Sequence, residues 1–150
     1  MNDHSKTYQS PSQAVKIEAL LLTCMDFRLI EHKNKYMEMR GLTGDFDQII
    51  LAGASLGAIN EKYTSWNETF WQHLQLAIEL HNIRKVILMD HRDCGAYRII
   101  LKKDFYKNRK EETEIHSEYL NKLAKLIKEK YPHLEIEMLL MDLDGKVETF

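Results

Sequence analysis

This 150-residue sequence contains two cysteines and seven histidines, residue types that bind transition-metal ions. The two cysteines and one of the histidines, His91, have a spacing that suits a metal site. His91 and Cys94 are separated by two residues, which makes a short chelating pair, and Cys24 lies far upstream. Three such ligands with an open fourth position are typical of catalytic zinc sites, and bound Zn²⁺ lowers the pKa of water to about 7. The residue types therefore indicate a zinc site formed by Cys24, His91 and Cys94.

Two charged residues follow Cys24 at short spacing. Asp26 can accept a hydrogen bond from a zinc-bound water, and Arg28 can hold Asp26 through a charge-assisted pair. Asp26 could equally occupy the fourth ligand position. A plainer interpretation also stays open: both cysteines are core residues, since free Cys is often buried, and Asp26 and Arg28 form a structural ion pair.

The candidate ligands must be positioned by the elements that precede them. Apolar runs bounded by polar residues predict strands over 16–23, 46–53, 85–90 and 134–141. Asp144-Gly145 predicts a tight turn into a short terminal strand over 146–150. Helical character is expected over 29–40, and apolar spacing predicts helices over 65–81 and 111–130, the former opened by a capping box of Ser65 and Glu68. The basic stretch 98–110 is expected to be irregular.

Alternation of strands and helices predicts an α/β fold with a mostly parallel sheet flanked by helices. We expect the strand order 2-1-3-4, with the C-terminal strand as an antiparallel edge. Ligands bind such sheets beyond the carboxyl ends of the strands. Cys24 directly follows the first strand, and His91 and Cys94 follow the third. If these strands are neighbours, the three side chains meet at one edge of the sheet.

Composition limits the classes of function. The 21 Lys and Arg residues against 23 Asp and Glu residues leave no basic excess for nucleic acid. No run approaches the roughly 20 apolar residues of a membrane span. The polar start lacks a secretory signal, so a cytoplasmic location is expected, with reduced cysteines. Residues 1–14 are predicted to form a flexible arm, and residues 15–150 a single domain.

Other chemistries of cysteine and glycine fit less well. Arg28 and Arg98 each lie four residues after a cysteine, which is too close for the phosphate loop of a cysteine phosphatase. The sequence has no Cys-x-x-Cys pair of the thioredoxin type. Gly53-Ala-Ser-Leu-Gly57 lacks the full dinucleotide-binding fingerprint.

From Ile17 to the C-terminus, the sequence resembles the β-class carbonic anhydrases. Cys24-Met-Asp26-Phe-Arg28 matches their Cys-x-Asp-x-Arg motif, and His91-Arg-Asp-Cys94-Gly95 matches their His-x-x-Cys-Gly motif. The stretch from Gly44-Asp45 to Ala52-Gly53 is similar to the family's Gly-Asp…Ala-Gly strand, and residues 142–146 resemble its closing hairpin.

The resemblance implies a zinc-dependent lyase that reversibly hydrates CO₂ to bicarbonate. Zinc would be held by Cys24, His91 and Cys94, and a dyad of Asp26 and Arg28 would orient zinc-bound hydroxide. In some members the aspartate that matches Asp26 becomes the fourth ligand. The family also implies a homodimer or tetramer with active sites near the subunit interface. The backbone at Gly53 and Gly95 is expected to border the substrate, and Gly95 to permit close approach after the ligand.

The sequence departs from the family beside the Ala-Gly pair. Ile50-Leu51 stand where members commonly carry Arg-Asn, and Ala54 replaces the Asn that follows. The pocket should therefore be less polar. Two alternatives remain: an inactive zinc-binding relative that acts as an oligomeric or anion-binding protein, and a zinc hydrolase of another small linear substrate such as COS or CS₂.

Overall fold

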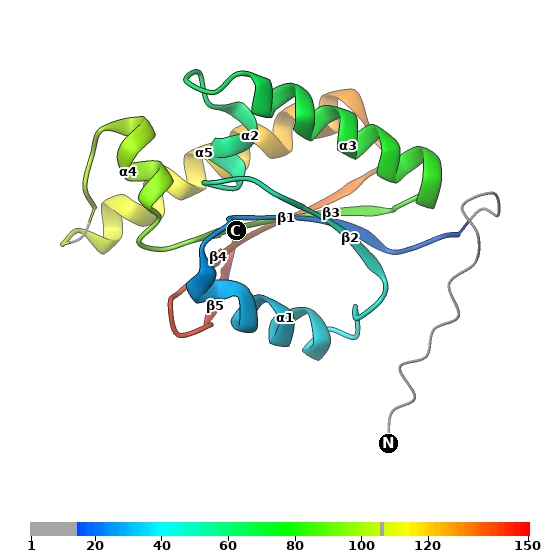
Figure 1. The fold of residues 1–150 in the computed structure, drawn as a ribbon, viewed down its shortest axis with the longest axis horizontal. Helices are drawn as coiled ribbons and strands as arrows, with labels where there is room; N and C mark the ends of the chain where they lie inside the picture. Colours follow the sequence, from blue (N-terminus) through cyan, green and yellow to red (C-terminus); the bar gives the residue numbers. More distant parts are fainter. Residues whose placement is uncertain (1–14, 106) are drawn as a thin grey trace.

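The fold is a five-stranded sheet with helices on both faces (Figure 1). The structure, a computed structural model, describes residues 15–105 and 107–150, so the arm predicted over 1–14 lies outside the described residues. The strand order β2-β1-β3-β4-β5 confirms the prediction, with β5 antiparallel to β4 and every other pair parallel. The strands are β1 (Ala19–Thr23), β2 (Phe46–Ile50), β3 (Lys85–His91), β4 (Glu135–Met141) and β5 (Val147–Thr149).

Helices α2, α3 and α5 lie on one side of the sheet and α1 on the other, while α4 extends from the end of β3 (Figure 1). A short 3₁₀ helix, η1, leads into α1. The bounds are η1 (Phe27–Leu29), α1 (Ile30–Met39), α2 (Ser55–Ile59), α3 (Ser65–His81), α4 (Gly95–Leu101) and α5 (Arg109–Lys130).

Side-chain alternation along the central strands forms two separate cores. The even-numbered residues of β1 and β3 pack against α3 and α5, in a cluster that includes Leu22, Leu88, Phe70 and Leu123. The odd-numbered residues pack with α1, in a cluster that includes Leu21, Ile87, Met89, Met37 and Met141. Because both faces are covered, β1 and β3 are buried along nearly their whole length, and their central residues are apolar. A polar residue at the end of either strand is therefore exceptional.

Three local predictions are wrong. Thr64, not Ser65, precedes the first turn of α3, and no described side chain caps that end, so the expected capping box does not form. The stretch 98–110 is not wholly irregular, because Arg98 to Leu101 complete α4 before the left-handed Lys102 ends it. Helix α2 was not predicted, because five residues are too few to show helical periodicity.

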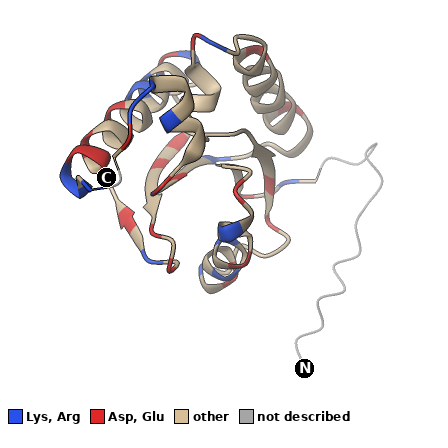
Figure 2. Ribbon diagram, turned by 60° about the vertical axis from the view of Figure 1, so that its left-hand side comes forward, with Lys and Arg blue, Asp and Glu red and all other residues tan. Residues whose placement is uncertain are grey.

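Charged residues are distributed over the surface in both signs. Figure 2 shows Lys and Arg interspersed with Asp and Glu along α5. In the part of the chain that the structure describes, no helix combines the length and apolar character that crossing a membrane requires.

Candidate metal centre

Cys24, His91 and Cys94 meet at the carboxyl end of the sheet, as the order of the strands predicts. β1 and β3 are hydrogen-bonded neighbours, so the residues that follow them reach the same edge. One potential ligand atom from each of the three residues lies within 4.8 Å of the others, and the two sulfurs are 4.0 Å apart. Two sulfurs and one imidazole nitrogen at this separation can contact a single ion of the size of Zn²⁺.

His91 presents one ring nitrogen to this cluster. Its Nδ1 lies 2.7 Å from the carbonyl oxygen of Arg92, which fixes the proton on Nδ1 because a carbonyl only accepts. Its Nε2 is buried and makes no hydrogen bond within the described residues. A backbone hydrogen bond of this kind typically orients a metal-ligating histidine. A buried nitrogen without a hydrogen bond, on a ring held in this way, fits the role of a metal ligand.

The two thiols shift each other's pKa in opposite directions. Their contact, aided by His91 and opposed by burial, holds the pKa of Cys24 well below its usual range. The same contact and burial raise the pKa of Cys94. Burial lowers the pKa of His91, but the neighbouring Cys24 outweighs it, and the net shift is upward. The cluster therefore already favours one thiolate, which is the form that binds metal.

Arg28 holds Asp26 and also contacts the loop between His91 and Cys94. Its guanidinium donates to both carboxylate oxygens of Asp26, with Nη2 2.7 Å from Oδ2. Its Nη1 and Nη2 donate to the carboxylate and the backbone carbonyl of Asp93, each at 3.0 Å. The hydrogen bonds from Arg28 hold the pKa of Asp26 at about 2, and Asp26 Oδ2 lies 3.8 Å from His91 Nε2. Asp26 is thus an ionised carboxylate that lies next to the three candidate ligands.

The chain turns sharply between β2 and α2 and there supports Cys24. The Gly53 amide donates to the Cys24 sulfur at 3.4 Å, and Gly53 has a φ of 80°. Ala54 follows with a φ of 44°, a conformation that L-residues rarely adopt. A Cβ at Gly57 would lie 2.4 Å from the Ala52 carbonyl oxygen, so glycine is required there. At Gly95 an added Cβ would meet only the far end of Arg98 at 3.7 Å, so no contact among the described residues requires glycine there.

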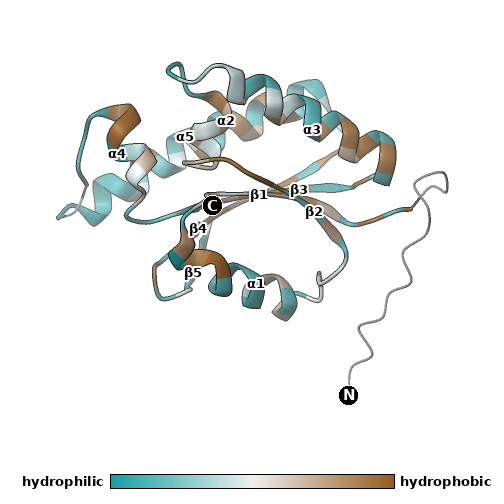
Figure 3. Ribbon diagram, in the orientation of Figure 1, coloured by the Kyte–Doolittle hydropathy of each residue, from teal (hydrophilic) through white to brown (hydrophobic). Residues whose placement is uncertain are grey.

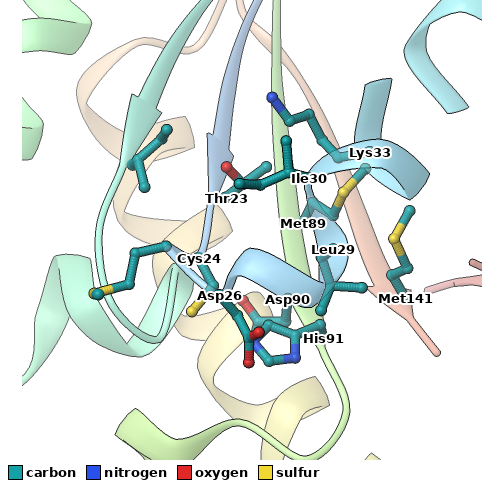
Figure 4. A pocket seen from close by; sticks show the side chains of 12 residues that line it. Thr23, Cys24, Asp26, Leu29, Ile30, Lys33, Met89, Asp90, His91 and Met141 are labelled. Carbon is teal, nitrogen blue, oxygen red and sulfur yellow. The ribbon is translucent and has the colours of Figure 1, made fainter. Parts of the chain in front are cut away.

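A pocket of about 260 Å³ opens beside the cluster on the α1 side of the sheet. Figure 4 shows Asp26 and His91 side by side at one end of it, near Cys24. The opposite wall is largely apolar and includes Leu29, Ile30, Ile50, Met89 and Met141. Ile50 thus lines the pocket, as the departure from the family motif suggested. Lys33 adds a cation to the lining and donates to Gln48 Oε1 at 3.0 Å.

Some residues that build the centre were not singled out from the sequence. Asp93 lies in the loop between His91 and Cys94; it has a φ of 55° and accepts from Arg28. Asp90 ends the apolar run of β3 and is buried, and it contacts Ser55, Tyr97 and His116. The available signal was an acidic residue at the end of a strand that is otherwise buried on both faces.

The fold and the site geometry define a class of protein. It is an α/β protein with a candidate cysteine–histidine metal centre beyond the carboxyl ends of its strands. The profile of the putative carbonic anhydrase family matches residues 14–150. The chain belongs to this family.

Its curated relatives include two uncharacterized rickettsial proteins. One, from Rickettsia bellii strain RML369-C, is 44% identical over 146 residues, which cover 97% of this chain and 85% of the relative. The other, from Rickettsia conorii strain Malish 7, is 43% identical over 147 residues, covering 98% and 76%.

Solved β-carbonic anhydrases share the fold. A structure from a study of two tetrameric β-carbonic anhydrases of Sordaria macrospora matches with a TM-score of 0.61 and 16% identity, covering 93% of this chain and 83% of that one. A mutant of CafD from Aspergillus fumigatus matches with a TM-score of 0.57 and 14% identity, covering 95% and 96%. At this identity the likeness establishes the fold.

Proposed function

We propose that this protein is a zinc-dependent carbonic anhydrase that reversibly hydrates CO₂ to bicarbonate, with its zinc domain over residues 15–150. The observation that carries the proposal is the buried Nε2 of His91, which makes no hydrogen bond to the described residues and lies among Cys24, Cys94 and Asp26. Family membership supports the same reaction. Bound zinc would supply a Lewis acid that makes a hydroxide nucleophile accessible near neutral pH.

The ligand set we propose is Cys24, His91 and Cys94, and the chain orients it by hydrogen bonds. The Gly53 amide directs the Cys24 sulfur, and the Arg92 carbonyl directs the His91 ring. Groups held in this way need little rearrangement on binding, which favours affinity and a fixed geometry.

Asp26 is the proposed catalytic carboxylate, and Arg28 holds it ionised. A carboxylate with a pKa of about 2 accepts a hydrogen bond at neutral pH and orients the water that attacks CO₂. The same position allows Asp26 to bind the metal as a fourth ligand in a resting form. Arg28 makes either arrangement durable because it fixes Asp26 through two parallel hydrogen bonds.

The apolar pocket supports a neutral substrate. CO₂ carries no net charge, and side chains such as Ile50 and Met141 do not compete with it for hydrogen bonds. The backbone at Gly53 and Gly95 is proposed to border the substrate as well. Lys33 contributes a positive charge that attracts the bicarbonate product.

Stopped-flow CO₂ hydration by the zinc-loaded chain tests the proposal. We expect about one zinc per chain and a rate above buffer that is lost in Asp26→Ala while zinc is retained. A zinc-bound wild-type chain without a rate above buffer would contradict the activity and favour the inactive, anion-binding or oligomeric relative.

A second candidate is hydrolysis of another small linear molecule, such as COS or CS₂. The apolar wall around Ile50 favours it, because sulfur-containing substrates are larger and more polarisable than CO₂ and gain more from apolar contacts. The same zinc-loaded protein would be assayed on the three substrates. The ratios of kcat/KM then decide between the two candidates.

We also propose a homodimer or tetramer that forms around this end of the sheet. A hollow of about 850 Å³ adjoins the metal cluster and is lined by Met25, Phe27, Tyr63, Trp66 and Ile99. Phe27 is 81% exposed and Ile99 61%, and Figure 3 shows hydrophobic segments in α4 and at the start of α1. Exposed apolar surface of this kind is typical of protein interfaces.

The free thiols fit a reducing compartment, so we propose that the protein is cytoplasmic.

A further inference from the structure

Asp90 is a fully buried carboxylate that the proposed reaction does not use. Its side chain is 0% exposed and lies at the end of β3, next to His91. Its Oδ1 accepts from the Ser55 amide at 3.0 Å. Its Oδ2 is 2.7 Å from Ser55 Oγ, 2.5 Å from Tyr97 Oη and 2.7 Å from His116 Nδ1. Four donors from three helices thus converge on one carboxylate.

Burial of a carboxylate is unfavourable unless its oxygens are satisfied. Four hydrogen bonds fill the acceptor capacity of the group, so Asp90 is stable only where α2, α4 and α5 all keep their positions. A well-packed apolar residue would hold the helices with less loss of solvation. The chain instead uses a carboxylate, which fixes distances and angles that apolar contacts leave adjustable.

The segments that Asp90 ties together are those that orient the candidate ligands. Ser55 lies two residues after Gly53, whose amide donates to the Cys24 sulfur. Tyr97 lies three residues after Cys94, in the first turn of the helix α4 that begins directly after Cys94. His91 directly follows Asp90 along β3. Each candidate ligand is therefore close to a group bound to Asp90: His91 is its neighbour in sequence, Cys94 lies three residues before Tyr97, and Cys24 accepts from Gly53, two residues before Ser55.

We infer that Asp90 is a positioning residue of the metal centre, whose carboxylate fixes the β2–α2 corner, the end of β3 and α4 relative to one another. The inference rests on the proposed function, because it requires that Cys24, His91 and Cys94 bind an ion. It assigns Ser55, Tyr97 and His116 to the same network. These residues do not contact the ion themselves. They set the distance between the two sulfurs and the position of the imidazole ring relative to them.

Metal binding by Asp90→Asn tests the inference. In either orientation of the new side chain, its amide places an NH₂ group against a donor, either the Ser55 amide or the three donors at Oδ2. We expect zinc affinity, measured by competition with a chromophoric chelator, to fall about 10- to 100-fold. We also expect the visible spectrum of the Co²⁺-loaded protein to change, because that spectrum reports ligand geometry.

Ile83→Ala is the matched control for a general loss of stability. Ile83 is buried in the α3 and α5 core just before β3 begins, at the opposite end of the sheet. This variant should unfold more readily yet keep the zinc affinity and the Co²⁺ spectrum of the wild type. An equal loss of affinity in Ile83→Ala and Asp90→Asn would overturn the inference.

Two milder variants keep the test decisive if Asp90→Asn does not fold. Ser55→Ala and Tyr97→Phe each remove one hydroxyl donor and leave the carboxylate in place. We expect affinities between those of the wild type and a disrupted site. Wild-type affinity and spectrum in both variants, or in a folded Asp90→Asn, would refute the positioning role. A wild-type chain that binds no metal would instead refute the proposed function, and with it the inference.

Discussion

Polar side chains at the amino end of the sheet pair with one another near the surface, whereas the carboxyl end also holds a group of polar side chains that is almost fully buried. At the amino end, Arg84 pairs with Glu18 at 2.9 Å, and its side chain is 63% exposed. His81 and Asp47 pair at 2.6 Å, each about one third exposed. At the carboxyl end, the side chains of Asp90, His91 and His116 are at most 3% exposed.

The difference separates two uses of charge in one sheet. Exposed ion pairs contribute little to stability, because water screens them and the side chains lose freedom. Buried polar groups lower stability unless they are satisfied, so a fold that concentrates them at one end has a reason other than stability. The carboxyl end is therefore where substitutions should affect function, and the amino end where they should not.

His91→Asn and His81→Asn make the largest expected contrast, because each histidine lies near an aspartate at one end of the sheet. His91→Asn should remove zinc binding and reduce CO₂ hydration to the buffer rate. It should also abolish the increase in Tm that zinc gives, since only binding to the folded state stabilises. Metal analysis and thermal unfolding measure both effects. Loss of zinc in His81→Asn as well would break the comparison.

Asp26→Asn should affect catalysis without removing the metal. We expect kcat to fall by about 10²- to 10⁴-fold, the usual contribution of a positioned acid–base group, while zinc stays near one per chain. Asp47→Asn, the same change at the amino end, should keep wild-type kcat. Stopped-flow assays on zinc-loaded proteins measure the difference, and equal rates in the two variants would remove Asp26 from the mechanism.

Phe27→Glu should weaken self-association. A buried phenylalanine contributes about 1.5–3 kcal/mol, so the dimer dissociation constant should increase at least tenfold. Leu80→Glu changes a side chain that is 50% exposed near the amino end, and this variant should assemble like the wild type. Sedimentation velocity over a range of concentrations follows the change. Unchanged assembly in Phe27→Glu would place the interface elsewhere.

Glu137→Gln should give the smallest effect, on stability alone. Burial raises the pKa of Glu137, but hydrogen bonds from Arg40 and Lys85 outweigh it and leave the pKa below its ordinary value. The ionised carboxylate therefore stabilises the fold above the unfolded pKa, and this contribution is lost as pH falls through the lower folded pKa. Denaturant unfolding from neutral to acidic pH should show a shallower acid decline in Glu137→Gln, of less than about 1 kcal/mol. An unchanged pH profile would contradict this prediction.

Much of the fold and the ligand cluster could be predicted because both follow from local patterns and one topological rule. The apolar spacing behind Ser65 predicted 65–81, which are the bounds of α3. Alternation of strands and helices predicted neighbouring parallel strands, whose carboxyl ends bring Cys24 to His91 and Cys94.

The remaining features depend on contacts between distant elements. Asp90 is recognisable as a buried node only once the register of α5 brings His116 over the end of β3. Asp93 resembles an ordinary turn residue until Arg28 is seen to reach it from the other loop. Helices α2 and α4 have five and seven residues, too few for a periodic signal.

The reach of Arg28 has a kinetic consequence. The Arg28 guanidinium donates hydrogen bonds to both the Asp26 loop and the Asp93 loop, so neither loop can move away without breaking them. An ion bound between the two loops would dissociate only when the loops separate, and this requires several charge-assisted hydrogen bonds of Arg28 to break together. Exchange of bound metal with free metal should accordingly be slow, and the chain would keep its ion through long intervals of scarcity.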